Sequence, residues 1–356
     1  MEEYGKILVI AMPAFLLLIV IEKAYGYFKG NDTTPLMDTV SSLSSGITNA
    51  TKDVLGISIS ILTYEWMVSK VAFFTIENTI LTYIIAFFVI DFYGYWSHRW
   101  SHQINIFWNK HAIHHSSEEF NLACALRQSI SSFVNLFTFL LLPAAFLGVP
   151  AEVIAIVLPL HLFLQFWYHT KHIGKMGILE KIIVTPSHHR VHHAINKEYL
   201  DKNHGQIFIF WDKWFGTFQE EEERPTYGIT TPVQSWNPVW VNISHYATMK
   251  EELKMIPNLK DKVRYLFNKP GWLPEYLGGY RAVKDVGPDY KKFDTTVPLP
   301  LNYYVFFQYV VLMGLTAFFL FNLGKFDWMT KVGLSVLIIW STVSFSGIFE
   351  QKKWYH

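Results

Sequence analysis

The sequence predicts an all-α, multi-span integral membrane protein with a histidine-rich di-metal site at the cytosolic ends of its helices. Three observations lead to this class. Hydrophobic residues make up 51% of the 356 residues and charged residues only 17%, against roughly 25% charged residues in an average soluble domain. Several apolar segments reach the length of about 20 residues that a bilayer-spanning helix needs. Most of the 15 histidines fall in tight groups between residues 98 and 193.

The apolar segments define the expected spans. We expect helices across the bilayer over Gly5 to Tyr27, Val71 to Ile90, Leu301 to Leu323 and Val332 to Phe349, and a helical hairpin over Ile130 to Tyr168 that is broken at Leu147–Pro150. Val54 to Val68 is borderline, either a span or an interfacial helix. The first segment follows two acids and lacks a clear small-residue cleavage site, so we interpret it as a retained helix rather than a signal peptide.

Charge predicts the topology. The stretch between His169 and Pro300 carries 18 of the 30 lysines and arginines, and positive residues beside spans favour the cytoplasmic side. If the hairpin 130–168 crosses the bilayer and returns, residues 91–129 are cytosolic too. All the histidine groups then lie on the same face of the membrane. The membrane is then a bacterial inner membrane or the endoplasmic reticulum.

Four parts of the chain follow from these spans. They are N-terminal transmembrane helices (1–90), a catalytic domain (91–225) containing the hairpin 130–168, a cytosolic segment (226–300) and a C-terminal transmembrane hairpin (301–356). The single Cys124 excludes an internal disulfide framework and a cysteine metal cage. The net charge of +1 gives no sign of a nucleic-acid partner.

The histidine groups have the spacing of metal ligands. They are "HRWSH" (His98, His102), "HAIHH" (His111, His114, His115), "HTKH" (His169, His172) and "SHHRVHH" (His188, His189, His192, His193). Residues at i, i+3 and i+4 share one face of a helix, so each group can aim two or three imidazoles at one point. Thr185 and Pro186 are typical of an N-cap and a first helical residue, which places the last group at a helix start.

Imidazole is a common ligand of iron, copper, zinc and nickel. Eight to ten convergent histidines are too many for one ion and fit two. The candidate acids around such a site are Asp91, Glu118, Glu119 and Asp201. Isolated histidines are more often satisfied core residues, and we assign His161, His245 and His356 to that class. His188 and His204 stay open between a ligand and a supporting role.

The order HxxxH, HxxHH, HxxHH on a multi-span chain resembles the fatty acid hydroxylase/sterol desaturase superfamily, over about Asp91 to Phe218. Its members are membrane non-haem di-iron oxygenases. Several stretches are similar to the alkylglycerol monooxygenase branch. They are "KHAIHHSSEEFN", "QFWYHT", "LEKIIVTPSHHRVHHAIN" and "DKNHGQIFIFWDKWFGTFQEE".

The resemblance implies two iron ions. Zinc could replace iron in a purified sample, because affinity rises toward zinc along the divalent series. The resemblance implies ligands at His98, His102, His111, His114, His115, His189, His192 and His193, together with His169, and it keeps His172 as a tenth candidate. It also implies an ether lipid substrate from the bilayer, O2 and a reduced pterin as electron donor. No haem- or flavin-binding domain is visible in the sequence, so we expect a separate electron donor.

Two other hypotheses remain open at this stage. The same site could desaturate or hydroxylate a fatty acyl, sterol or carotenoid substrate. The histidines could instead serve a zinc hydrolase or a metal-ion transporter. A hydrolytic zinc site needs only about three protein ligands, and a transporter binds its cargo near the bilayer midplane, whereas these groups fall at predicted helix ends.

Overall fold

The computed structural model describes residues 2–57, 59, 60, 62–130, 134–286 and 290–353, without the side chains of residues 2–11, 59, 60, 134 and 135. Within these residues the fold is all-α, as predicted, apart from one two-residue parallel pair, β1 (Ile59–Ser60) with β2 (Val134–Asn135).

Three of the described helices are long and apolar enough to cross a membrane. They are α4 (Ile80–Gln103), α13 (Leu299–Phe321) and α14 (Trp328–Phe349). The last two form the predicted C-terminal hairpin and pack against each other and against α2 (Leu36–Val54). The first predicted span coincides with α1 (Glu2–Phe28), of which the side chains of residues 2–11 lie outside the described ones.

The span predicted over 71–90 lies further along the chain. The helix α3 (Tyr64–Val71) ends where that span was expected to begin, and α4 starts only at Ile80. Thr79 and Thr82 form a capping box there, which satisfies backbone N–H groups at the helix start. The shift gives α4 room to carry His98 and His102 in its last two turns. The borderline segment 54–68 is not a span, because it covers the end of α2, β1 and the start of α3.

The apolar tract 130–168 folds as a short hairpin and not as two spans. It contains η1 (Phe137–Leu141), α7 (Leu142–Leu147) and α8 (Ala151–Phe163). At about 1.5 Å per residue, α8 is roughly 20 Å long, against a bilayer core of about 30 Å. The predicted break is confirmed. Gly148 ends α7 with φ +76°, and a Cβ there would lie 1.9 Å from the carbonyl oxygen of Phe74.

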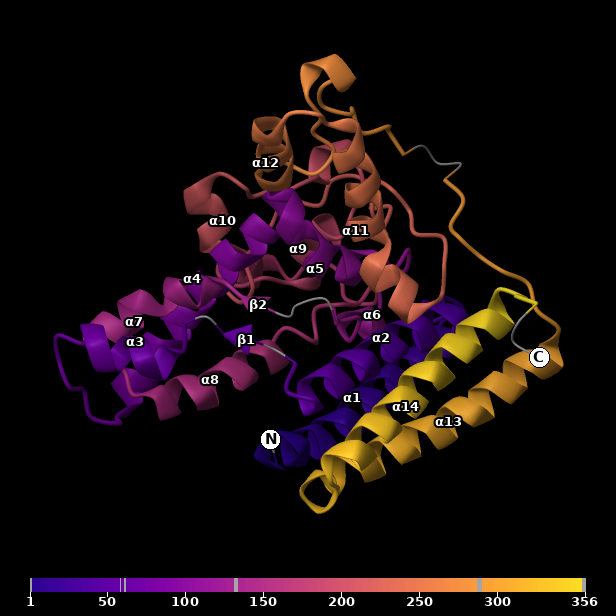
Figure 1. Ribbon diagram of the computed structural model, residues 1–356, viewed down its shortest axis with the longest axis horizontal. Coiled ribbons are helices and arrows are strands. Elements are labelled where there is room, and N and C mark those ends of the chain that lie inside the picture. Colours follow the sequence, from indigo (N-terminus) through magenta and orange to yellow (C-terminus); the bar gives the residue numbers. More distant parts are fainter. Residues whose placement is uncertain (1, 58, 61, 131–133, 287–289, 354–356) are drawn as a thin grey trace.

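The helices form two apolar bodies below a more polar one (Figure 1). One body contains α1, α2, α13 and α14, and the other contains α3, α7 and α8. Above them lie the remaining helices, α5 (Asn105–His115), α6 (Leu122–Ala125), α9 (Pro186–His192), α10 (Phe210–Phe215), α11 (Pro238–Met255) and α12 (Leu259–Phe267). Short turns complete the set at η2 (Gly177–Lys181), η3 (Lys197–Tyr199), η4 (Glu275–Leu277) and η5 (Leu323–Lys325).

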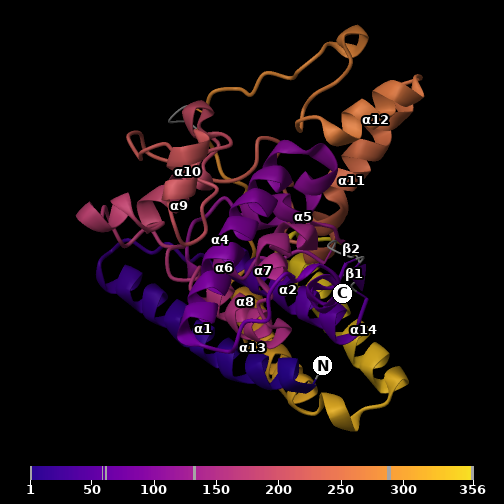
Figure 2. The same cartoon turned by 90° about the vertical axis from the view of Figure 1, so that its left-hand side faces the viewer.

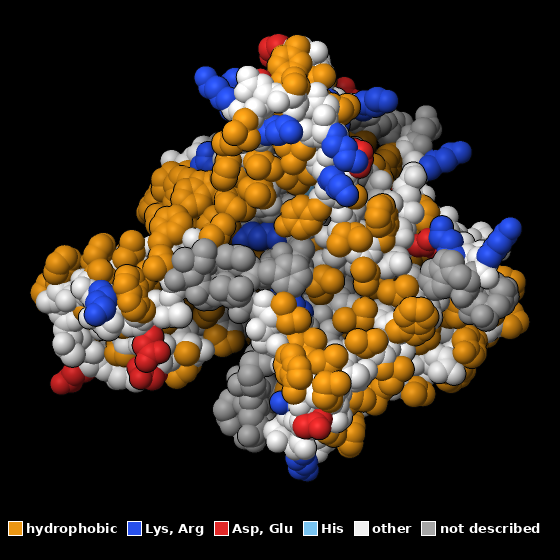
Figure 3. All heavy atoms as spheres, viewed as in Figure 1, with side chains coloured by type: hydrophobic (Ala, Val, Ile, Leu, Met, Phe, Trp, Pro, Cys, Tyr) orange, Lys and Arg blue, Asp and Glu red, His pale blue; other side chains and the backbone are white. Residues whose placement is uncertain are grey.

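The surface follows this division. In Figure 3, hydrophobic side chains cover the lower bodies, whereas lysines and arginines gather around α11 and α12. Figure 2 shows α1, α13 and α14 below and α9 to α12 above. The end of α4 reaches α5 in the upper region, so the histidine-bearing segments meet near the border of the two regions.

Asp91 anchors the polar region to α4. Its carboxylate is fully buried and accepts hydrogen bonds from His161 Nε2 at 2.7 Å, from the backbone N–H groups of Ile207 and Phe208, and from Trp211 Nε1 at 2.8 Å. The contacts join α4, α8 and the start of α10. The prediction that Asp91 supports a metal ligand is therefore wrong, and the prediction that His161 is a satisfied core residue is confirmed.

We expect Asp91→Ala to destabilise the protein by about 3 kcal/mol or more, because it leaves several buried donors without an acceptor. The measurement is the midpoint of thermal unfolding in detergent. The control is Glu152→Gln on the exposed side of α8, which should leave the midpoint unchanged. Equal midpoints for both variants would show that Asp91 is not a structural anchor.

Candidate metal centre

Nine of the ten predicted histidines converge in two groups. Group A consists of His98, His102, His111, His115 and His192, and group B of His114, His169, His189 and His193. Within each group the candidate ligand nitrogens all lie within 4.8 Å of one another. Both groups are buried or nearly so.

Helical periodicity explains how few elements build both groups. His98 and His102 lie one turn apart on α4. On α5, His111 and His115 turn to group A while His114 turns to group B. α9 repeats the division, with His192 in group A and His189 and the C-cap residue His193 in group B.

The two groups are neighbours because these helices serve both. The rings of His115 and His193 stack with centroids 4.2 Å apart, although they belong to different groups. A pair of metal ions bound in the two groups would therefore lie side by side.

The Nε2 atoms are the converging atoms. In group A, His111 Nε2 lies 2.8 Å from His98 Nε2 and 3.0 Å from His115 Nε2. In group B, successive Nε2 atoms of His114, His169, His189 and His193 lie 3.2, 2.8 and 3.1 Å apart. Nitrogens bound to one metal at about 2.1 Å would be separated by about 3 Å at right angles, so the spacing fits metal ligands.

Hydrogen bonds from the other ring nitrogens fix which atom faces inward. His98 Nδ1 donates to the carbonyl of His204 at 2.8 Å, His192 Nδ1 to that of Lys202 at 2.9 Å, and His169 Nδ1 to that of Gln165 at 3.0 Å. A carbonyl can only accept, so the proton of each neutral ring is on Nδ1 and its Nε2 presents a lone pair. This is the tautomer that a metal requires.

Two ring nitrogens of group A lack a partner in the part of the chain that the structure describes. His102 Nε2 and His192 Nε2 are buried without any hydrogen-bond partner among the described residues. Burial also lowers the pKa of His111, His115, His189, His192 and His193 well below the ordinary value, so protonation does not supply the missing positive charge. The donor set therefore fits a pair of metal cations.

Acidic residues are scarce around the groups. Of the remaining acids predicted to support the site, Asp201 lies 3.9 Å from His102 Nδ1. Glu118 instead accepts from the backbone N–H of Phe293, and Glu119 pairs with Lys171 and Lys292, so these two predictions are wrong. Among the described residues no carboxylate joins either group.

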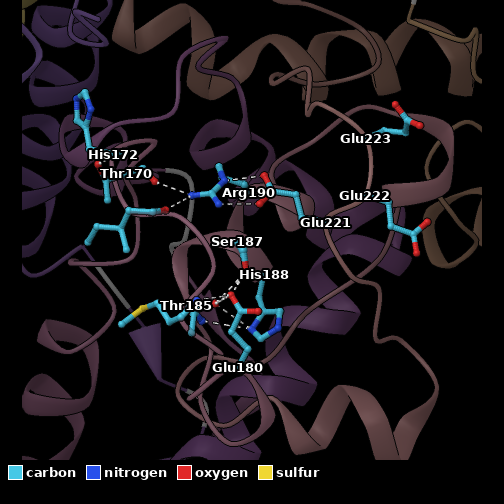
Figure 4. A network of polar contacts seen from close by, with 12 residues as sticks. Thr170, His172, Glu180, Thr185, Ser187, His188, Arg190, Glu221, Glu222 and Glu223 are labelled. Atoms are coloured by element: carbon cyan, nitrogen blue, oxygen red, sulfur yellow. Dashed lines mark hydrogen bonds and ion pairs between the residues drawn. The ribbon is translucent and has the colours of Figure 1, made fainter. Parts of the chain in front are cut away.

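Arg190 fixes α9 in place, which the sequence analysis did not foresee. Its guanidinium pairs with both carboxylate oxygens of Glu221 at 2.7 and 2.6 Å. It also donates to the carbonyls of Thr170 and Ile173 just beyond His169 (Figure 4). The sequence signal was an arginine inside the histidine motif "SHHRVHH", followed about 30 residues later by the acidic run 220–223.

A second support lies in the loop 203–205. Asp212 accepts from the backbone N–H groups of His204 and Gly205, both at 2.7 Å, and from Thr217 Oγ1 at 2.6 Å. These three hydrogen bonds fix the loop that carries the His204 carbonyl, and that carbonyl orients the His98 ring. The His204 ring lies 5.1 Å from that of His102, centroid to centroid, and supports the site rather than joining a group.

The other predicted histidines lie outside both groups. His172 is placed away from them, with its Nε2 3.2 Å from Thr33 Oγ1 and its ring against Tyr25. His188 completes a capping box with Thr185, whose backbone N–H donates to His188 Nδ1. His245 is partly buried rather than in the core, and its Nε2 bonds to Asn105 Oδ1 at 3.0 Å. His356 lies outside the described residues.

Comparison with known proteins agrees with the resemblance noted in the sequence. The family model described as fatty acid hydroxylase matches residues 83–217. The chain is 33% identical to human alkylglycerol monooxygenase over 318 residues, which cover 88% of this chain and 71% of that protein. No solved structure matches the fold.

Further relatives extend this likeness over the whole chain. The alkylglycerol monooxygenase of Danio rerio is 30% identical over 356 residues, 99% of this chain and 79% of the relative. That of Xenopus tropicalis is 32% identical, over 84% of this chain and 68% of its own. The protein therefore belongs to the fatty acid hydroxylase family, in the group formed by the alkylglycerol monooxygenases.

Proposed function

We propose that groups A and B bind two iron ions and that the protein is a lipid monooxygenase acting on alkylglycerols. The convergence of nine histidine ring nitrogens in two adjacent groups is the observation that carries the proposal. The relatives named for alkylglycerol oxidation support the substrate class. When bound, the iron pair would supply O2 activation for insertion of oxygen into a C–H bond.

The reaction is proposed at the alkyl carbon beside the ether oxygen. One oxygen atom of O2 replaces hydrogen by hydroxyl at that carbon, and the other leaves as water after accepting two electrons and two protons. The resulting hemiacetal breaks down to an aldehyde and glycerol. A reduced pterin, as a separate diffusible donor, would supply the two electrons, becoming oxidised to the dihydro level.

The protein's part in this scheme is to hold the imidazoles and to exclude water. Phe120 is fully buried and contacts His193 and His169, with ring centroids 5.2 and 5.8 Å apart. Tyr168 covers His189 with centroids 4.4 Å apart. Such a dry wall protects a reactive intermediate from side reactions.

The stretch Phe163–His169 contributes less of this wall than its aromatic content suggests. Phe163 and Phe166 pack on Phe15 of α1, and Tyr168 alone of its aromatic residues before His169 contacts a histidine of the groups.

We further propose that the site faces the cytosol. The abundance of lysine and arginine between residues 169 and 300 supports this orientation. His98 and His102 lie within the last six residues of α4, so group A would lie at the end of a span. This position disfavours a transporter, whose cargo site would lie near the middle of the bilayer.

The metal proposal is tested by His192→Ala. We expect the iron content of protein purified after iron loading to fall from about two ions to about one per chain, because group A loses one of its five ligands, and we expect turnover to be abolished. The measurement is elemental analysis combined with oxygen uptake.

The matched control is His172→Ala, which removes the same side chain outside both groups. It should retain both ions and most of the activity. Loss of iron in the control, or two ions and full turnover in His192→Ala, would contradict the assignment of ligands.

The substrate proposal is tested by incubating membranes that contain the protein with alkylglycerol and reduced pterin in air. We expect fatty aldehyde, and none when O2, pterin or alkylglycerol is left out. Mass spectrometry of the lipids would detect the alternative outcome. A new double bond or hydroxyl group on a fatty acyl, sterol or carotenoid, without aldehyde, would replace this proposal with a desaturase or hydroxylase of that lipid.

A further inference from the structure

A cavity of about 310 Å³ lies beside the candidate metal centre and has no part in the function derived so far. Leu36 to Asp38 at the start of α2, Ser116 and Arg127 line it, together with Trp236 and Phe293. Ser116 directly follows His115 of group A. The cavity therefore adjoins the end of α5, the helix that serves both groups.

Three buried polar atoms that have no hydrogen-bond partner among the described residues belong to side chains that line this cavity. They are Asp38 Oδ2, Arg127 Nε and Asn302 Oδ1. Asp38 Oδ1 accepts from Ser117 Oγ at 2.8 Å and from Arg127 Nη1 at 3.4 Å. Arg127 Nη1 also donates to Ser42 Oγ at 3.2 Å, but Asp38 Oδ2 and Arg127 Nε have no partner within the described part of the chain.

Burying the Asp38–Arg127 ion pair costs free energy when no ligand completes its hydrogen bonds. Asp38 is 3% exposed and Arg127 2% exposed, and a buried charge is stabilising only when further hydrogen bonds complete it. Burial raises the pKa of the Asp38 carboxyl even beside Arg127. A ligand that donates to the carboxylate and accepts from Nε–H would remove this cost.

The charge of the lining restricts the ligand. Four acidic side chains and two basic ones surround the cavity, namely Asp38, Glu118, Glu119, Asp294, Arg127 and Lys292. Their formal sum is negative, which disfavours a phosphate. Hydroxyl groups both donate and accept, so a neutral vicinal diol matches Asp38, Arg127 and Asn302.

The position of the cavity indicates where the ligand comes from. Asn302 lies in the first turn of α13, a helix long and apolar enough to cross the membrane. The cavity is therefore at the end of a candidate span, the level at which a lipid has its polar end. Leu36, Met37, Trp236 and Phe293 supply apolar surface for the adjoining part of such a molecule.

We propose that this cavity binds the uncharged, hydroxyl-bearing headgroup of the lipid substrate, with Asp38 and Arg127 as its specificity-determining pair. This inference rests on the proposed lipid monooxygenase function. It adds that the enzyme selects free glycerol headgroups over phosphorylated ones, and that it does so beside the ends of the histidine-bearing helices.

The test uses the full chain in nanodiscs, with 1-O-hexadecylglycerol and its phosphate ester as probes. We expect Asp38→Asn to raise the KM for 1-O-hexadecylglycerol at least tenfold, to reduce its preference over the phosphate ester by a similar factor, and to leave the iron content unchanged. Asp53→Asn is the matched control, with the same change at the other end of α2. Its KM should stay within twofold of the unaltered protein.

Equilibrium binding of radiolabelled 1-O-hexadecylglycerol to metal-free protein gives a readout that does not depend on turnover. Asn302→Leu is a second variant for this measurement, and it should weaken binding even if Asp38→Asn fails to fold. Free glycerol at the same concentration should not compete, and competition would indicate a soluble polyol site instead of a lipid site.

Two failures are distinguishable. An unaltered protein that converts no alkylglycerol contradicts the proposed function, whereas binding to the metal-free chain still tests the cavity. An unaltered protein that turns over alkylglycerol, with KM, preference and binding unchanged in both Asp38→Asn and Asn302→Leu, overturns the headgroup site.

Discussion

The structure depends on one arrangement, in which backbone carbonyls hold the Nδ1–H groups of buried histidines so that their Nε2 lone pairs face each other. The carbonyls of His204, Lys202 and Gln165 do this for His98, His192 and His169. Lone pairs about 3 Å apart repel each other unless a cation lies between them. Among the described residues no donor reaches Nε2 of His102 or His192, and burial, by lowering the pKa of both, keeps these rings neutral.

Three buried networks keep those carbonyls and rings in position. Asp91 joins α4 to the start of α10, Asp212 shapes the loop that carries the His204 carbonyl, and Arg190 connects α9 to the backbone beyond His169. Each network uses a charged group with several hydrogen bonds, which is how a buried charge is made tolerable. The cost of burying these charges is offset by precise placement of histidines from four separate segments. The Asp38–Arg127 pair differs because it is only half satisfied.

Much of the site was predictable because histidine spacing reports helix faces directly. The i, i+3, i+4 pattern identified eight of the nine grouped histidines, whereas His169 was expected from the family resemblance. Thr185 with Pro186 correctly marked the start of α9. The division of His111, His114 and His115 between two groups was not predictable, because it depends on how α5 crosses α4 and α9. The role of His188 was equally hidden, since a capping histidine and a ligand have the same sequence spacing.

The spans were predicted less well, for a physical reason. Hydropathy does not distinguish a helix in lipid from one packed on its neighbours, so α7 and α8 were mistaken for spans although they are too short. The start of α4 was misplaced because the capping box at Thr79 and Thr82 was overlooked. The long, uninterrupted α13 and α14 left no such ambiguity, and their ends were predicted to within four residues.

The most direct test of the central claim is an experimental structure of the iron-loaded protein with anomalous diffraction recorded at the iron edge. The account predicts two adjacent iron peaks, one bound by Nε2 atoms of group A and one by Nε2 atoms of group B, with His172 bound to neither. A single peak, ligation through Nδ1 of His98 or His192, or His172 as a ligand would contradict it.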